Sequence, residues 1–164
     1  MSRLRFLKEQ SAFAAEMTQK LVKKVDEADW MTPPKIIASN INWQVGHILI
    51  AKYFHSIMCV IGRQKPYKEQ MPLKDYAAWY AMGSNPAAFA DSKPSKEKLL
   101  ADLAFMDEKV LQTIDSISEE DLDQEVLEEN PMAKTKYEAL NWSYMHQMWH
   151  NGQIAMIKRV LKRK

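Results

Sequence analysis

The sequence is poor in cysteine and in glycine. Its 164 residues include a single cysteine, Cys59, and only four glycines. One cysteine excludes an internal disulfide and a zinc site built from several cysteines. The scarcity of glycine and of β-branched runs, together with 11 methionines, favours helices over sheet. The composition therefore predicts an all-α protein.

The chain also lacks a large net charge and a long apolar run. A formal net charge of +2 is too small to indicate a nucleic-acid partner. No uninterrupted apolar run approaches the roughly 20 residues of a membrane span, and the N-terminus lacks the apolar core of a signal peptide. Hydrophobic content of 46% and charged content of 27% are typical of a soluble globular protein. We therefore expect a single cytoplasmic domain over residues 1–164, with no nucleic-acid and no membrane partner.

Four long segments carry apolar residues at the three- and four-residue spacing of a helix. They are predicted at residues 3–28, 40–62, 96–117 and from 135 to the end of the chain. Pro33 and Pro34 end the first segment because proline cannot donate to a helix. The expected N-caps of the other three are Asn40 or Asn42, Ser95, and Thr135, which pairs with Glu138 in a capping box.

Residues 63–94 form a long connection between the second and third of these segments. They contain four of the seven prolines, and only residues 75–82 favour a short helix. Such a length is uncommon between antiparallel neighbours, but it suffices to cross the body and begin a parallel helix. We therefore predict a four-helix bundle in the order up, down, down, up, with a long crossover between helices 2 and 3.

Two histidines, His146 and His150, lie four residues apart in the last segment. This spacing places them on one helix face, one turn apart, so both imidazoles can bind one divalent cation. Zinc proteases share the spacing, but Gln147 stands where they have a glutamate general base. The alternative is a pair of neutral core histidines, because the same face carries Ala139, Trp142, Gln153, Ile157 and Val160.

A third histidine, His47, lies on the apolar face of the second segment. A lone histidine there is more often a satisfied core residue than a ligand. Three neutral imidazoles buried together without a metal, however, would leave ring nitrogens that are hard to satisfy. On the same helical wheel His55 lies about 80° and Cys59 about 120° from His47. We therefore expect His55 on the flank or surface of the bundle, and Cys59 outside any metal site.

Two segments, Asn42-Trp43-Gln44-Val45-Gly46-His47-Ile48 and His146-Gln147-Met148-Trp149-His150-Asn151-Gly152-Gln153, resemble the signature segments of the DinB/YfiT-like superfamily. Residues 117–123 and 135–140 are also similar to it, so the likeness covers nearly the whole chain. The resemblance implies a four-helix bundle, frequent homodimers, and one divalent metal ion held by His47, His146 and His150. The ion varies among nickel, zinc, manganese and iron. Some relatives transfer low-molecular-weight thiols, such as bacillithiol or mycothiol, to electrophiles.

Three neutral ligands would leave the ion its full charge and at least one open position. Such an ion can bind a thiol as thiolate or lower the pKa of a bound water. No carboxylate shares the faces of His47 or His146, so a general base for hydrolysis is missing. We therefore favour transfer of a low-molecular-weight thiol to an electrophilic small molecule. A metal-dependent hydrolase and a non-catalytic metal- or ligand-binding bundle remain as alternatives, and no catalytic side chain is identified.

The surroundings of the three histidines give further expectations. Trp43, Trp142 and Gln153 are predicted to line the pocket, and Trp149 to add an apolar wall that excludes water. Gly152 is expected to permit a close approach of another backbone. Several apolar residues outside the core stripes of helices 1 and 4 indicate a twofold homodimer: Phe6, Phe13, Met145, Met148 and Met156.

Overall fold

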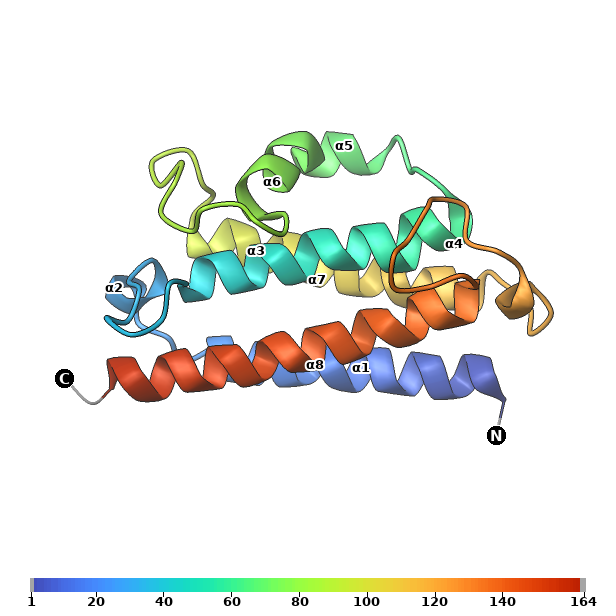
Figure 1. Cartoon of the computed structure of the whole chain (residues 1–164), viewed down its shortest axis with the longest axis horizontal. Helices are drawn as coiled ribbons and strands as arrows, with labels where there is room; N and C mark the ends of the chain where they lie inside the picture. Colours follow the sequence, from blue (N-terminus) through green and yellow to red (C-terminus); the bar gives the residue numbers. More distant parts are fainter. Residues whose placement is uncertain (1, 163–164) are drawn as a thin grey trace.

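The computed structural model describes residues 2–162, which fold into four long helical segments joined by short helices and loops (Figure 1). The long segments are α1 (Arg3–Val22), the continuous run of α3 (Ile41–Lys52), η1 (Tyr53–Met58) and α4 (Cys59–Ile61), then α7 (Lys96–Asp115) and α8 (Lys136–Leu161). The short helices are α2 (Glu27–Trp30), α5 (Tyr67–Gln70), α6 (Leu73–Tyr80) and the 3-10 turn η2 (Asp121–Asp123). Within residues 2–162 there is no β-strand, so the all-α class is confirmed.

The long helices pack side by side. α1 packs against α8 and α7, and α3 packs against α7, α8 and the short helix α6. In Figure 1, α1 and α8 run from right to left, whereas α3 and α7 run from left to right. Residues 62–95 cross the top of the view from the end of α4 to the start of α7. This crossover packs α6 against α3.

The beginnings of three long helices are fixed by the predicted caps. The side chains of Asn40 and Ser95 each accept a hydrogen bond from the backbone N–H three residues later. Thr135 and Glu138 form the reciprocal capping box that opens α8. Each cap satisfies a backbone donor that has no partner within its own helix. These three predictions are confirmed.

The first helix is shorter than predicted. α1 ends at Val22, and Glu27–Trp30 form a separate turn, whereas the apolar pattern predicted one helix as far as Ala28. Part of the reason lies in a distant residue, because Lys158 of α8 donates a hydrogen bond to the carbonyl of Leu21. This side chain satisfies one of the carbonyls that a helix end leaves without an intrahelical partner. The spacing of apolar residues contains no information about such a contact.

The crossover contains two short helices instead of one. α6 occupies residues 73–80, close to the predicted 75–82, but α5 was not predicted. Pro66 and Pro72 stand immediately before these two helices. Proline suits the first turn of a helix, where its missing N–H would have no partner anyway. These two prolines of the long connection therefore stand at the starts of helices.

The helix from Ile41 to Ile61 is the most apolar part of the chain. It is long and apolar enough to cross a membrane, with a mean hydropathy of 1.3, yet 67% of the window is buried inside the protein. It contains no uninterrupted apolar run of this length, because His47, Lys52 and His55 lie within it. Its burial and its contacts with α7 and α8 are those of a central core helix.

A buried ion pair links this central helix to its neighbours. Lys52 Nζ lies 2.8 Å from Asp107 Oδ1 on α7 and donates to Gln147 Oε1 on α8 at 2.6 Å. Gln147 Nε2 in turn donates to Thr18 Oγ1 on α1 at 2.8 Å. One polar network therefore joins all four long helices. Gln147 is fully engaged in it and faces the core, so it takes no part in the histidine cluster.

Candidate metal centre

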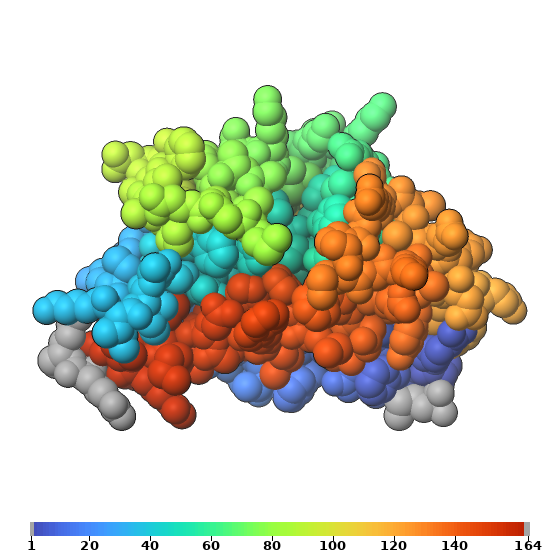
Figure 2. Space-filling model, viewed as in Figure 1, coloured from blue at the N-terminus to red at the C-terminus, as the bar shows by residue number. Residues whose placement is uncertain are grey.

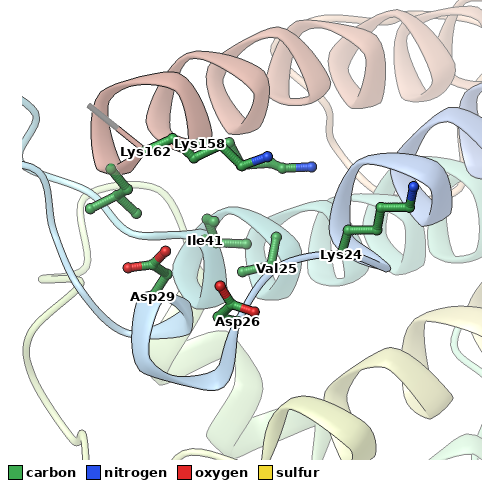
Figure 3. Close-up of a pocket in the computed structure, with 8 residues that line it drawn as sticks. Lys24, Val25, Asp26, Asp29, Ile41, Lys158 and Lys162 are labelled. Atoms are coloured by element: carbon green, nitrogen blue, oxygen red, sulfur yellow. The ribbon is translucent and has the colours of Figure 1, made fainter. Parts of the chain in front are cut away.

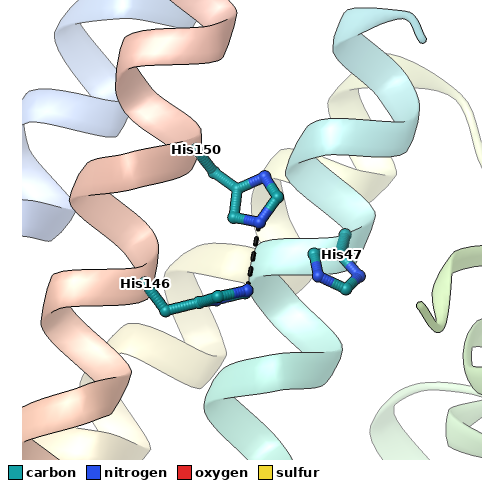
Figure 4. Close-up of side chains that lie close together, drawn as sticks. All are labelled: His47, His146 and His150. Carbon is teal, nitrogen blue, oxygen red and sulfur yellow. Dashed lines mark hydrogen bonds between the residues drawn. The ribbon is translucent and has the colours of Figure 1, made fainter. Parts of the chain in front are cut away.

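His47 on α3 faces His146 and His150 on α8 (Figure 4). One ring nitrogen of each histidine lies within 4.8 Å of the others, and the Nε2 atoms of His146 and His150 are 3.0 Å apart. Two nitrogens bound tetrahedrally to zinc at 2.0–2.1 Å are separated by roughly 3.3 Å. The structure thus brings the three predicted ligands together in a cluster of the size that one divalent ion requires.

Tyr80 determines which nitrogen of His47 is free. His47 Nδ1 lies 2.7 Å from the carbonyl oxygen of Tyr80, and a carbonyl can only accept a hydrogen bond. Nδ1 therefore carries the proton and Nε2 keeps its lone pair. The Trp43 ring stacks on the imidazole at 4.7 Å and is held by its own N–H, which donates to Ser84 Oγ at 2.8 Å. His47 is thus fixed in the tautomer and orientation of a metal ligand.

Gln44 fixes His150 in the same way. The amide nitrogen of Gln44 donates to Ser39 Oγ at 2.9 Å and to Gln153 Oε1 at 3.1 Å. Its oxygen is therefore the atom that faces His150 Nδ1, at 2.5 Å. This bond places the proton of His150 on Nδ1 and leaves the lone pair on Nε2. Gln153, predicted to line the pocket, acts one step away from the ligand, through Gln44.

His146 completes the cluster. Its ring lies 5.1 Å from that of His47 and 4.4 Å from that of His150, and the ring of Trp142, which was predicted to line the pocket, lies 6.0 Å away. Because Nε2 of His150 carries a lone pair, its 3.0 Å contact with Nε2 of His146 needs either the Nε2–H of a neutral His146 or a metal cation between the two nitrogens. In the second case both nitrogens present lone pairs to the ion, so these residues fit a bound cation.

Burial keeps the three imidazoles neutral. Burial together with the neighbouring histidines lowers the pKa of His146 to about 3 and that of His150 to about 4. The pKa of His47 is also lowered by burial, while its bond to Tyr80 acts in the opposite direction. A metal ion needs neutral imidazole ligands. At pH 7 the cluster is already in that state.

His55 contradicts its predicted place on the flank or surface. It is only 9% exposed, and its ring lies 6.2 Å from that of His146. The cause is the π-helix η1, in which each turn takes one extra residue. One extra residue is equivalent to about 100° on a wheel drawn at 3.6 residues per turn. The wheel that placed His55 about 80° from His47 therefore does not apply within η1. Regular periodicity gives no signal for this residue.

Two expectations about α8 are wrong. Trp149 is 63% exposed, so it cannot act as an inner wall that excludes water, although its ring lies 6.4 Å from that of His150. Gly152 is exposed, and a Cβ built there would meet nothing within 4 Å. The close approach occurs instead at Gly46, where a Cβ would lie 2.4 Å from the ring of Tyr80. Gly46 therefore allows Tyr80 to reach its position above His47.

The surface near the cluster is hollowed. In Figure 2, atoms of the second long helix (teal) lie at the base of a hollow between the crossover (green to yellow) and α8 (orange to red). A cavity of about 380 Å³ lies between residues 31–40 and 85–90, with a mostly apolar lining that includes none of the three histidines. Its lining residue Ser39 accepts a hydrogen bond from Gln44, the residue that also bonds His150. The volume lies within the usual range for small-molecule sites.

A second hollow can be set aside. Figure 3 shows it near the end of α8, where Lys24, Lys158 and Lys162 lie close to Asp26 and Asp29. Its volume is about 20 Å³, enough for about one water molecule. It is too small for a substrate and holds none of the predicted site residues.

Comparisons with known proteins identify a family and a fold. The family model of the DinB superfamily matches residues 10–154. A solved structure, described as a conserved protein from Enterococcus faecalis, has a TM-score of 0.78 to this chain at 17% identity. The match covers 100% of this chain and 99% of that one, and at such low identity it shows the fold alone. No curated protein matches the sequence.

Proposed function

The chain belongs to the DinB superfamily, and we propose that it binds one divalent metal ion through Nε2 of His47, His146 and His150. The observation that carries this proposal is the pairing of tautomers. The Tyr80 carbonyl accepts a hydrogen bond from Nδ1–H of His47, and the Gln44 amide oxygen accepts one from Nδ1–H of His150. The Nε2 atoms of both rings therefore carry the lone pairs that are available to a metal ion. Nickel, zinc, manganese and iron are the candidate ions.

Elemental analysis tests this site directly. The full chain, produced without a histidine tag, should contain near-stoichiometric divalent metal. His47→Ala, His146→Ala and His150→Ala should each abolish it. His55→Ala is the matched control, because it removes a buried histidine that is not a proposed ligand. Wild-type metal content in all three ligand variants would contradict the assignment.

We further propose that the site activates a low-molecular-weight thiol for transfer to an electrophilic small molecule. A bound divalent ion would supply the positive charge that favours the thiolate form of the thiol. The three neutral histidines leave that charge undiminished, and among residues 2–162 the cluster contains no carboxylate. Trp43 and Trp142 flank the imidazoles and limit the access of water. The neighbouring cavity of about 380 Å³ can accept an apolar electrophile.

A metal-dependent hydrolase is the second candidate, because His55 supplies a titratable group beside His146 that sequence reasoning missed. Burial lowers the pKa of His55 to about 4, however, which makes it a weak base at neutral pH. A general base works best with a pKa near the operating pH. This comparison favours thiol transfer.

Conjugation of 2-mercaptoethanol to a chloro-nitrobenzene separates the two reactions. In thiol transfer a carbon–sulfur bond forms, the carbon–chlorine bond breaks, chloride leaves, and the thiol proton passes to solvent. The metal-loaded protein should accelerate this step, and His150→Ala should not. Rapid ester or amide cleavage without a thiol would favour the hydrolase. Stoichiometric metal with neither activity would favour a non-catalytic binding bundle.

We also infer a cytoplasmic homodimer of up-down-down-up bundles. The directions of the four long helices and the crossover support that topology (Figure 1). Four of the five apolar residues expected at the dimer surface are exposed, on the adjacent helices α1 and α8: Phe6, Phe13, Met145 and Met156. Met148 is only partly exposed. Sedimentation that shows a monomer at tens of micromolar would contradict the dimer.

A further inference from the structure

His55 differs from His47 and His150 in where its proton lies. Asn130 Oδ1 accepts a hydrogen bond from the backbone N–H of Met132 at 2.9 Å, which fixes the orientation of the amide. Asn130 Nδ2 therefore faces His55 Nδ1, at 2.8 Å. An amide NH₂ can only donate, so Nδ1 of His55 accepts and the proton lies on Nε2. His47 and His150 carry theirs on Nδ1.

The Nε2–H of His55 has no acceptor among residues 2–162, since the hydrogen bond of this ring uses Nδ1. His55 is only 9% exposed, but Nε2 is not among the fully enclosed polar atoms without a partner, so a ligand or a water molecule can reach it. The ring is hydrogen-bonded to Asn130 and makes a T-shaped contact with the ring of Phe54, with the ring centroids 5.0 Å apart. The same η1 turn that buries His55 places its ring 6.2 Å from His146. A rigid, unpartnered N–H group thus stands beside the cluster.

His55 is unsuited to be a fourth ligand. Its nitrogens fall outside the group of atoms that lie within 4.8 Å of one another. Its lone pair on Nδ1 is occupied by Asn130, and Nε2 carries a proton, whereas a metal ligand needs a lone pair. A fourth imidazole in the coordination sphere would also close the open position that a substrate needs.

We propose that the Nε2–H of His55 donates a hydrogen bond to a small anionic ligand held at the three-histidine site, such as a thiolate or an oxyanion. The inference rests on the proposed metal site. Three neutral ligands leave the ion with its full charge, so an anion is the expected occupant of the open position. A neutral donor then stabilises the anion without weakening the attraction of the ion for it. Asn130 is the positioning residue that holds His55 in this tautomer.

The tautomers can be measured without any metal. Long-range proton–nitrogen NMR spectra of the metal-free full chain should show His55 protonated at Nε2, and His47 and His150 protonated at Nδ1. Asn130→Ala should remove the preference of His55 and leave the other two rings unchanged. A wild-type His55 protonated at Nδ1 would overturn the proposal, whatever the protein does with metals.

Anion binding tests the role itself. The full chain is loaded with cobalt(II), and azide is titrated while the visible absorption of the ion is followed. His55→Leu should weaken azide binding roughly tenfold or more, because the lost hydrogen bond has a charged acceptor. His55→Gln, which keeps an N–H donor, should recover part of the affinity.

The control is Cys59→Ala, since Cys59 is buried and also contacts Asn130 but offers no donor to the anion. Cobalt stoichiometry should stay unchanged in every variant. Unchanged azide affinity in His55→Leu, or an equal loss in Cys59→Ala, would overturn the donor role. Failure of the wild type to bind cobalt would instead contradict the proposed metal site, and the NMR result would still decide the tautomer.

Discussion

The histidine cluster lies between two helices, the central helix with His47 and α8 with His146 and His150. We call these helices the two walls of the cluster, and they are held in place differently. On the central helix, His47 is bonded to the crossover through Tyr80 and stacked against Trp43, and Lys52 anchors the same helix in the core. On α8, His150 is bonded to Gln44, whereas His146 is only partly buried and Trp149, next to His150, is largely exposed. The central helix is therefore the fixed wall, held by several contacts, whereas α8 is partly exposed at the surface. A site of this kind holds its ligands in place on one side and leaves access for a substrate on the other.

The largest change in stability is expected from loss of the buried ion pair of the fixed wall. Asp107→Ala would leave the ammonium of Lys52 buried, with only Gln147 as a partner. We expect the free energy of unfolding to fall by about 3–5 kcal/mol, as measured by urea denaturation. Glu9→Ala is the matched control, because it removes the exposed pair with Arg5 and should change stability little. Equal effects of the two variants would show that burial of the pair is unimportant.

The second test separates the residues that orient His150. Gln44→Leu removes the acceptor for Nδ1 of His150, so the ring can adopt the wrong tautomer. Metal affinity, measured by competition with a coloured chelator, should fall roughly 10- to 100-fold. Gln153→Leu removes only one of the two bonds that orient Gln44 and should have a smaller effect. Equal losses would mean that the two glutamines act through packing instead.

The third test compares a glycine on each wall. Gly46→Ala would place a methyl group 2.4 Å from the Tyr80 ring and should destabilise the protein by about 1–3 kcal/mol through overpacking. Gly152→Ala meets nothing within 4 Å and should stabilise α8 by about 0.5–1 kcal/mol, because alanine favours a helix. Thermal unfolding of the two variants measures both effects. Shifts of the same sign would contradict the difference between the walls.

The same contrast explains which features could be predicted from sequence. α8 is a regular helix, so the spacing of His146 and His150 translated directly into a shared face. The central helix departs from 3.6 residues per turn at η1. The segment Tyr53–Met58 contains no proline or glycine that would indicate this change in the sequence. η1 makes contacts with α8 that the sequence does not indicate: Ser56 Oγ within η1 donates to Ser143 Oγ on α8 at 2.7 Å.

The backbone groups that orient the histidines also could not be predicted from the sequence. The carbonyl of Tyr80 orients His47, but a carbonyl belongs to every residue and leaves no signature in the sequence. The requirement for Gly46 follows from the same contact, because only the fold brings a ring against it. Residue types therefore predicted the three candidate ligands, and the fold was needed to find the groups that orient them.

The smallest expected effect concerns pH and the fixed wall. Burial lowers the pKa of His55 from 6.5 to about 4 in the folded protein, so between these values the unfolded chain binds the proton more readily. The contribution of His55 to stability is therefore complete above pH 6.5 and is lost as the pH falls toward 4. Between pH 7.5 and pH 5.5 it should amount to about 1 kcal/mol. The lowered pKa values of His47, His146 and His150 add losses of the same sign. Urea denaturation of the metal-free protein at both values should therefore show a loss about 1 kcal/mol smaller in His55→Gln than in the wild type. An equal loss in the variant would mean that His55 is solvated in the folded protein, and that η1 does not bury it beside the cluster.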